Sequence, residues 1–124
     1  MSIVTLNKAQ QGPDIFGSLT SGGYNLVQNA AGVSGLDATT DRQVTPSDLK
    51  LDPTLGNHDG PTQTLALLPG SIAIDVVPAK ACSFTVTDIA GHPVAITTDQ
   101  RSNPRPDGLE KACDIGAYES SYVD

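Results

Sequence analysis

Short apolar clusters separated by turn-forming residues run along the whole chain. The first cluster, SIVTL at residues 2–6, stops at Asn7 and predicts a strand. Residues 14–21 have the two-residue period of a strand, with Ile15 and Leu19 in the same set, so that one set can face a core. The 12 glycines and 9 prolines are distributed throughout, which disfavours long helices. The pattern predicts an all-β chain of short strands and turns.

The spacing of these clusters favours stacked coils over a sandwich. Gly22 and Gly23 supply a turn before the next apolar cluster, residues 24–27. Short strands broken by single Asn or Gly corners suit a solenoid whose coils stack in parallel, whereas a sandwich uses longer hairpins. Residues 29–56 are poor in apolar side chains and predict a loop excursion from the coil, with turns or a short capped helical turn at residues 45–48.

The second half of the chain predicts a different arrangement. Four elements are expected: a turn at residues 59–61, a strand or short helix at 62–68, a strand at 71–77 and a β-hairpin at 84–96. The strand at 71–77 would place Ile72, Ile74 and Val76 on one face. The hairpin would be an insertion ahead of the C-terminal motif.

Composition excludes several classes of partner. Fourteen acidic residues against seven Lys and Arg give a net charge of −7, and no basic cluster interrupts them, so nucleic acid is not expected as a partner. No apolar run approaches the roughly 18 residues of a membrane span, and the first ten residues lack the features of a signal peptide. The five aromatic residues include no Trp, which weakens a sugar-stacking hypothesis.

Two cysteines, Cys82 and Cys113, match no zinc or redox motif. Two interpretations stay open at this point: two buried free thiols, or one disulfide that closes a loop of about 31 residues and stabilises the fold by about 3–4 kcal/mol in an oxidising compartment. We predict the disulfide.

Residues 97–119 are dense in charged residues. Six residues are expected to form a structural lock, in which arginine side chains held by carboxylates fix a loop that lacks regular hydrogen bonding: Asp75, Asp99, Arg101, Arg105, Asp114 and Glu119. Arg101 and Asp114 are expected to matter for folding. The alternative makes the acids a general acid–base pair or calcium ligands.

Other candidates for chemistry are weaker. His58 and His92 each lie in a Gly/Pro turn and are expected to be exposed. Ser71 lacks the following glycine of a nucleophile elbow. The four lysines are scattered, and no motif indicates the alternative of a Lys–Asn isopeptide. No catalytic residue, metal ligand or cofactor is therefore expected, with calcium as the alternative.

Five motifs together resemble a known family. They occur in this order: GPDIFGSLTSGGYNLV, DPTLG, DGPTQTLALLPGSIAID, TDQRSNPRP and CDIGAYE. Residues 2–119 thus resemble the C-terminal region of bacterial choice-of-anchor Q domain proteins, pectate-lyase-like surface proteins with a right-handed parallel β-helix. The chain departs from the family at residues 57–60, NHDG, where DNGG is more usual, and in the longer stretch 84–96. The resemblance implies an extracellular or cell-surface setting and no established catalytic residue.

These observations predict the terminal coils and C-terminal cap of a right-handed parallel β-helix with a β-hairpin insertion. Residues 1–56 would form the coils and residues 57–124 the capping region, as one compact unit. The expected function is a non-catalytic structural module of a stalk, adhesin-like or fibre-forming protein, with a surface glycan or protein as a candidate partner. The alternative is the C-terminal part of a carbohydrate-active β-helix enzyme, a polysaccharide lyase or hydrolase, with its active site outside this chain.

The first strand leads to a prediction of self-association. Residues 2–6 would lie at an uncovered coil edge, and unpaired strand edges invite pairing with another chain. We therefore expect a homo-oligomer, either a dimer or a fibre, through four edge residues: Ile3, Val4, Thr5 and Leu6.

Overall fold

The computed structural model describes residues 1–108 and 110–122. Residues 109, 123 and 124, which fall in the predicted capping region, lie outside the described residues. The described chain is mostly non-helical, with strands of two to four residues and two helices of four residues each. The prediction of short strands and turns with little helix is confirmed at this level.

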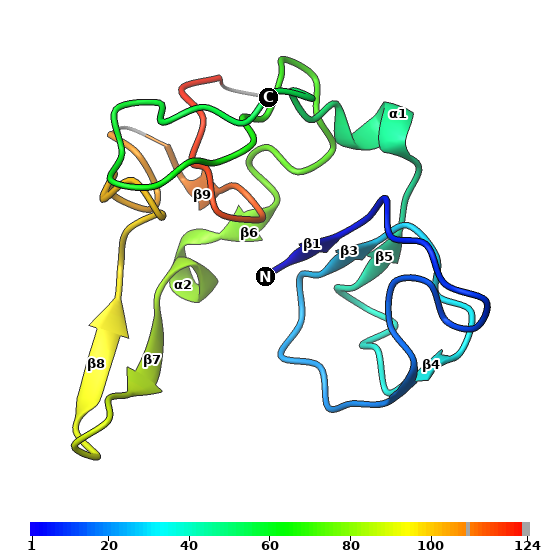
Figure 1. Cartoon of the computed structure of the whole chain (residues 1–124). Helices are drawn as coiled ribbons and strands as arrows, with labels where there is room; N and C mark the ends of the chain where they lie inside the picture. Colours follow the sequence, from blue (N-terminus) through cyan, green and yellow to red (C-terminus); the bar gives the residue numbers. More distant parts are fainter. Residues whose placement is uncertain (109, 123–124) are drawn as a thin grey trace.

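The first half of the chain forms two small parallel sheets. It contributes five strands: β1 (Ile3–Val4), β2 (Gly17–Ser18), β3 (Leu26–Val27), β4 (Val33–Ser34) and β5 (Arg42–Gln43). One sheet has the order β1-β3-β5, the other pairs β2 with β4, and all these pairs are parallel. The chain therefore passes back and forth between the two sheets, and each passage adds a strand beside its predecessor (Figure 1).

The central strand β3 is buried on both faces. In the register, Ile3 lies beside Leu26, and Val4 lies beside Val27. Leu26 and Val27 point to opposite faces because successive side chains alternate in a strand, and both are fully buried. A strand that is covered on both faces needs apolar residues at consecutive positions, and β3 has them in Leu26 and Val27.

The corners between strands bring the successive passages close together. A Cβ atom at Gly35 would lie 1.8 Å from the Leu19 carbonyl oxygen, and Gly35 has φ of +90°, so only glycine fits there. At another corner, the backbone N–H and the side-chain amide of Asn25 both donate to Asp41 Oδ1, each at 2.9 Å. These polar contacts replace the ladder hydrogen bonds that end with the short strands.

Of the two alternatives expected at residues 45–48, turns or a short capped helical turn, the structure has the helical turn. Helix α1 (Pro46–Leu49) begins after Thr45, whose hydroxyl accepts from the Asp48 N–H while the Asp48 carboxylate accepts from the Thr45 N–H. This reciprocal arrangement is a capping box. Leu49 is buried in the core, so the short helix turns the chain back toward the second half.

Residues 62–77 differ from the predicted strands. Residues 62–68 form neither a helix nor a continuous strand, and only isolated bridges are found there, such as Gly56 with Thr64. The strand expected at 71–77 is wrong: Ile74 N–H donates to Ser71 O in a turn, and Asp75 has φ of 55°, which is incompatible with a strand. Only its end belongs to a strand, β6 (Val77–Pro78). The apolar residues are buried by turns instead of by a sheet face.

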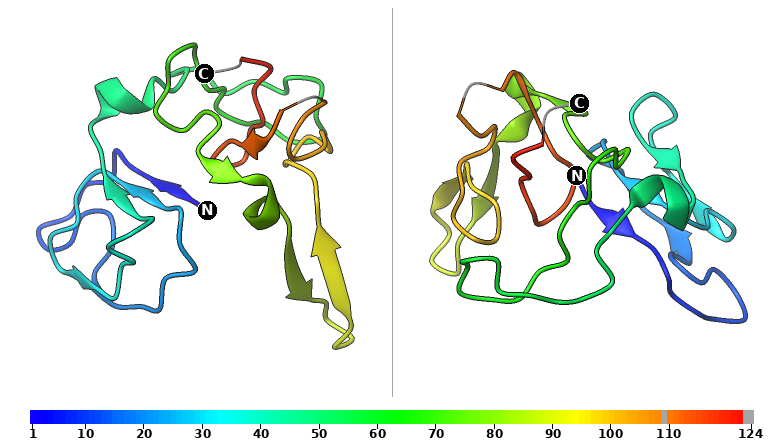
Figure 2. Two further views of the ribbon diagram at one scale, coloured as in Figure 1. Left: turned by 180° about the vertical axis from the view of Figure 1, so that it is seen from behind. Right: turned by 90° about the horizontal axis from the view of Figure 1, so that it is seen from above.

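The second half is completed by four further elements: α2 (Ala79–Cys82), β7 (Phe84–Thr87), β8 (Pro93–Ile96) and β9 (Ala112–Cys113). Strands β7 and β8 pair antiparallel, which confirms the predicted hairpin, and β6 pairs antiparallel with β9. The hairpin extends away from the remainder of the chain in both the first view and the view from behind (Figures 1 and 2). Ile89 at its tip is fully exposed.

One apolar core includes residues from both halves. Leu26, Val44 and Leu49 cluster with Ala73, Val77 and Ile115, among others. Within the described residues, neither helix is long and apolar enough to cross a membrane.

Strand β1 is shorter than expected. Leu6 has φ of 61° and is 65% exposed, so the predicted edge residue Leu6 lies beyond the strand. Ile3 and Val4 form the strand, and Thr5 follows it directly. The left-handed conformation at Leu6 ends the extended run, a feature that the apolar pattern SIVTL does not indicate.

Candidate functional site: a buried arginine–carboxylate cluster

The charged residues of the C-terminal motif come together in a buried cluster around two arginines. Arg101 pairs with Asp99, with Nε 2.9 Å and Nη2 2.7 Å from Asp99 Oδ2. The two side chains are only 9% and 0% exposed. Arg101 Nη2 also donates to the Glu119 carbonyl oxygen, and the guanidinium lies 3.7 Å from the centre of the Tyr118 ring. The Arg101 side chain is therefore fixed by an ion pair, a backbone carbonyl and an aromatic face.

Asp99 organises the backbone around it. Its carboxylate accepts hydrogen bonds from the backbone N–H groups of Arg101, Asn103 and Glu119, at 2.8, 3.0 and 2.9 Å. Burial opposes its ionisation, but the hydrogen bonds from the Glu119 N–H and from Arg101 hold the pKa of Asp99 below its usual range. Asp99 is thus a charged group that joins the 99–103 turn to the last segment of the chain.

Arg105 holds the carbonyl groups of the same last segment. Its Nη1 donates to Gly116 O at 3.0 Å, and its Nη2 donates to Asp114 O. Its Nε lies 3.2 Å from Glu119 Oε2, and its side chain is 7% exposed. A planar guanidinium with several donors suits a loop whose carbonyl groups have no ladder partners.

Two acids of the cluster have raised pKa values. Burial, together with the nearby Asp114 carboxylate, raises the pKa of Glu119 to about 8, although Arg105 acts in the opposite direction. Burial likewise raises the pKa of Asp114. Asp114 accepts hydrogen bonds from the backbone N–H groups of Asp75 and Ser120, at 2.8 and 2.7 Å, and its own N–H donates to the Glu119 carboxyl group.

The structure shows how the residues of the predicted lock are paired. The ion pairs join Arg101 to Asp99 and Arg105 to Glu119, while Asp114 is engaged by backbone N–H groups. All six predicted lock residues lie in or beside the cluster. Asp75 reaches it from a turn and not from a strand, through its backbone N–H.

Glu110 lies near the cluster with a perturbed pKa. Burial and a hydrogen bond with Asp107 raise the pKa of Glu110 to about 7. Among the described residues, no group of three or more His, Cys, Asp or Glu side chains is arranged to hold a metal ion. Glu119 is buried and its oxygens face Asp114 N–H and Arg105, so this carboxyl group is not placed to meet a substrate.

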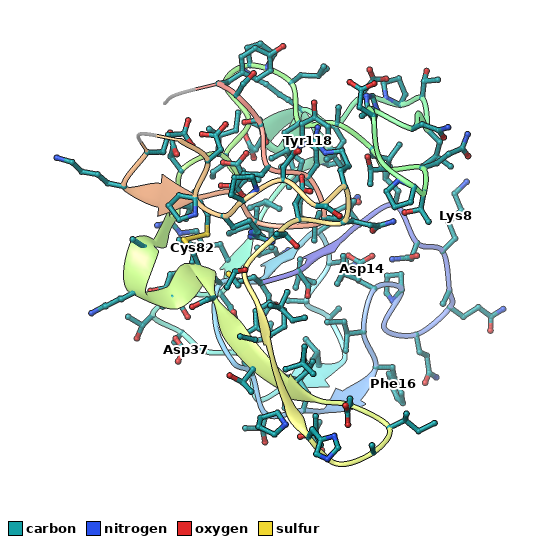
Figure 3. The ribbon with its side chains drawn as sticks, turned by 90° about the vertical axis from the view of Figure 1, so that its left-hand side faces the viewer. Lys8, Asp14, Phe16, Asp37, Cys82 and Tyr118 are labelled. Atoms are coloured by element: carbon teal, nitrogen blue, oxygen red, sulfur yellow. A yellow bond between two sulfur atoms is a disulfide. The ribbon has the colours of Figure 1, made fainter. Side chains whose placement is uncertain are left out.

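The disulfide between Cys82 and Cys113 is present, with the two Cα atoms 5.9 Å apart. The alternative of two free thiols is therefore wrong. The bond connects α2, at the base of the hairpin, to β9, and Figure 3 shows it next to the label of Cys82. It fixes both ends of the segment that contains the hairpin.

The two histidines have different surroundings. His92 is exposed at the hairpin turn, as expected, with Nδ1 3.5 Å from Asp88. His58 is half-buried and meets the Tyr118 ring edge-on at 5.4 Å between centroids, so its predicted exposure is wrong. Ser71 is also fully buried, and its hydroxyl donates to the Leu49 carbonyl, which is a structural role.

Tyr118 is a member of the cluster that the sequence analysis did not single out. Its ring lies between Arg101 and His58 (Figure 3 labels Tyr118). Gly60 permits this packing, because a Cβ atom there would lie 2.7 Å from Arg101 Cγ. Two sequence features could have drawn attention to this contact: Tyr118 is one of only five aromatic residues, and a glycine lies in the 57–60 turn. The spacing of Tyr118 and this glycine in the sequence does not indicate that they lie close together.

Comparisons with protein-family models, curated proteins and solved structures find no match for this chain. The resemblance to choice-of-anchor Q domain proteins thus stays a prediction.

Proposed function

We propose that this chain is a non-catalytic structural module, the terminal coils and C-terminal cap of a right-handed parallel β-helix. The observation that carries this proposal is the parallel pairing of β1 with β3 and β5, and of β2 with β4, as the chain passes alternately between the two sheets. Stacked parallel strands joined by short corners are the repeating unit of a solenoid. On this proposal, residues 1–56 form the coils and residues 57–124 the cap of one compact unit.

The arginine–carboxylate cluster supports the capping role. Arg101, Arg105 and Asp99 direct their hydrogen bonds to backbone groups of the last segment. Backbone groups at the end of a solenoid have no further coil to pair with, and burying them without partners costs free energy. Charged side chains that satisfy them serve as a lock.

The disulfide supports a secreted or cell-surface setting for the parent protein. Disulfides persist in oxidising compartments and are rare in reducing ones. Together with the family resemblance, this favours a stalk, an adhesin-like protein or a fibre-forming protein, with a surface glycan or protein as a partner.

Hydrogen exchange combined with a turnover assay tests the proposal. The amides of Leu26, Arg42 and Val44 donate to the preceding strand or corner, and we expect them to be protected as one cooperative unit with the amide of Ile115. Incubation with neutral and acidic polysaccharides is expected to release no new reducing ends. Turnover of any glycan, or unprotected Leu26 and Arg42 amides, would contradict the proposal.

A further inference from the structure

Strand β1 has an unpaired outer edge. The carbonyl group of Ser2 accepts from the N–H of Leu26 on β3, and that of Val4 accepts from the N–H of Gln28, directly after β3. Because backbone groups of successive residues point to opposite edges of a strand, the N–H and C=O of Ile3 and the N–H of Thr5 point away from β3. Within the described residues no hydrogen bond uses these groups, and β1 is the first strand in the order of its sheet.

This edge borders a groove of about 670 Å³. Residues 1–5 form one wall, and the far wall comes from the second half of the chain, with Gln63–Leu65, Gln100 and Gly116–Ala117. None of the 14 lining residues has an ionisable side chain, although the chain has 14 acidic and 7 basic residues. The amino group of Met1 donates to Gly23 O at 3.1 Å.

The lining combines apolar side chains with polar uncharged ones. Leu51, Leu55 and Leu65 provide apolar surface, and Gln63 and Gln100 provide amide groups. Thr64 also belongs to the lining, and its hydroxyl is buried without a hydrogen-bond partner among the described residues. The groove thus offers unused backbone groups on one side and polar groups that carry no charge on the other.

We propose that this groove binds an uncharged extended segment of a partner polypeptide, which pairs with β1 and adds a fourth strand to the β1-β3-β5 sheet. The inference deepens the proposed function and rests on it, since it takes the parallel strands of the β1-β3-β5 sheet as coils, with β1 at one edge of that sheet. Addition of a strand satisfies the free groups of Ile3 and Thr5 with main-chain hydrogen bonds. A charged side chain in the groove would lose water without gaining a partner.

Charge argues for a partner segment over a second copy of this chain. Each copy has a net charge of −7, so that two copies repel each other, whereas an uncharged segment meets no such barrier. The groove also has a far wall opposite β1. A segment in the groove would therefore have one edge toward β1 and the other toward this wall, which suits a single extended strand. β5, the other edge strand of the same sheet, carries the charged Arg42.

A synthetic peptide with the sequence of residues 23–29, acetylated and amidated, is the probe. This segment is uncharged and already pairs with the opposite edge of β1. We expect saturable binding by fluorescence anisotropy, and slower hydrogen exchange at the Ile3 and Thr5 amides but not at the Val4 amide. The same peptide with Leu26→Glu is expected to bind about tenfold or more weakly.

Matched variants of the protein separate the groove from the rest of the surface. Ala117→Lys places an ammonium group in the groove and should weaken peptide binding by about tenfold or more. Ala38→Lys makes the same change at an exposed turn outside the groove and should leave binding unchanged.

Three results would overturn the proposal: no saturable binding of the peptide, equal binding by the Ala117→Lys protein, or protection of the Ile3 and Thr5 amides without peptide in a particle of doubled mass. The last result would identify a second copy as the occupant. In the same hydrogen-exchange experiment, protection of the Leu26 and Arg42 amides shows whether the hydrogen bonds between the parallel strands of the coils are formed. Loss of binding with that protection intact rejects this inference alone, whereas loss of the protection rejects the proposed function.

Discussion

Replacement of Arg101 by alanine should destabilise the fold strongly. The substitution removes a buried ion pair to Asp99, a hydrogen bond to Glu119 O and the contact with the Tyr118 ring. Breaking a buried pair from one side costs about 3–5 kcal/mol, because the remaining charge is stranded. Asp99 keeps three backbone N–H donors, which places the expected loss of unfolding free energy near the lower end, at about 3 kcal/mol.

This loss converts into a large change in melting temperature. With an unfolding entropy of about 2.1 cal/mol/K per residue and 124 residues, a loss of about 3 kcal/mol lowers the melting temperature by about 12 °C. Urea unfolding followed by circular dichroism is the suitable assay, because guanidinium chloride would screen the ion pair. Arg101→Lys keeps the charge but cannot form the two-nitrogen contact with Asp99, so an intermediate loss is expected.

Arg42→Ala is the control, because Arg42 is exposed on β5. A surface arginine is expected to contribute less than about 1 kcal/mol. If Arg101→Ala unfolds at the same urea concentration as Arg42→Ala, the buried pair contributes no more than a solvated one, and the locking role of the cluster is wrong.

Three further predictions concern the carboxyl cluster, the disulfide and the coil corners. The pKa of Glu119 is raised from 4.5 to about 8, so between these pH values the folded chain binds more protons than the unfolded chain, and the free energy of unfolding should fall as pH rises from about 4.5 to 8. Glu119→Gln should flatten this decline in urea titrations at several pH values, and an unchanged slope would contradict the raised pKa. The Cys82–Cys113 bond joins residues 31 positions apart, and its reduction should lower the free energy of unfolding by about 3–4 kcal/mol. Two alkylated thiols in unreduced protein from an oxidising compartment would refute the bond. Gly35→Ala should lower the melting temperature more than Gly91→Ala. Both glycines have positive φ, but only at Gly35 would the added Cβ atom meet a carbonyl oxygen, at 1.8 Å. Equal decreases in melting temperature would mean that this close approach is absent.

The sequence predicted the elements whose signals are local. The short capped helical turn at residues 45–48, one of the two alternatives expected there, is held by residues three positions apart, and the hairpin at residues 84–96 depends on alternation around one turn. The bond between Cys82 and Cys113 was predicted because the segment between them contains the hairpin insertion, which has little apolar content to hold it. In each case the deciding contacts lie within the segment or have few alternatives.

The failures have a common cause in long-range packing. The cluster Ile72–Val76 alternates like a strand, but its backbone turns because Asp75 takes a left-handed conformation whose N–H donates to Asp114, 39 positions later. Likewise, the residues of the lock could pair in several ways, and their spacing does not indicate the pairs that form, Arg101 with Asp99 and Arg105 with Glu119. A single sequence shows which groups can bind each other, but it does not show which of several suitable partners is nearest.

The disulfide also changes what a protease can do to the molecule. The projecting hairpin is exposed along nearly all of β7 and β8, and it lies between Cys82 and Cys113 in the chain. A single cleavage anywhere in residues 83–112 therefore produces two polypeptides that stay covalently joined. The coils and the C-terminal cluster would remain one particle after such a cut, and the two fragments would separate on a gel only after reduction.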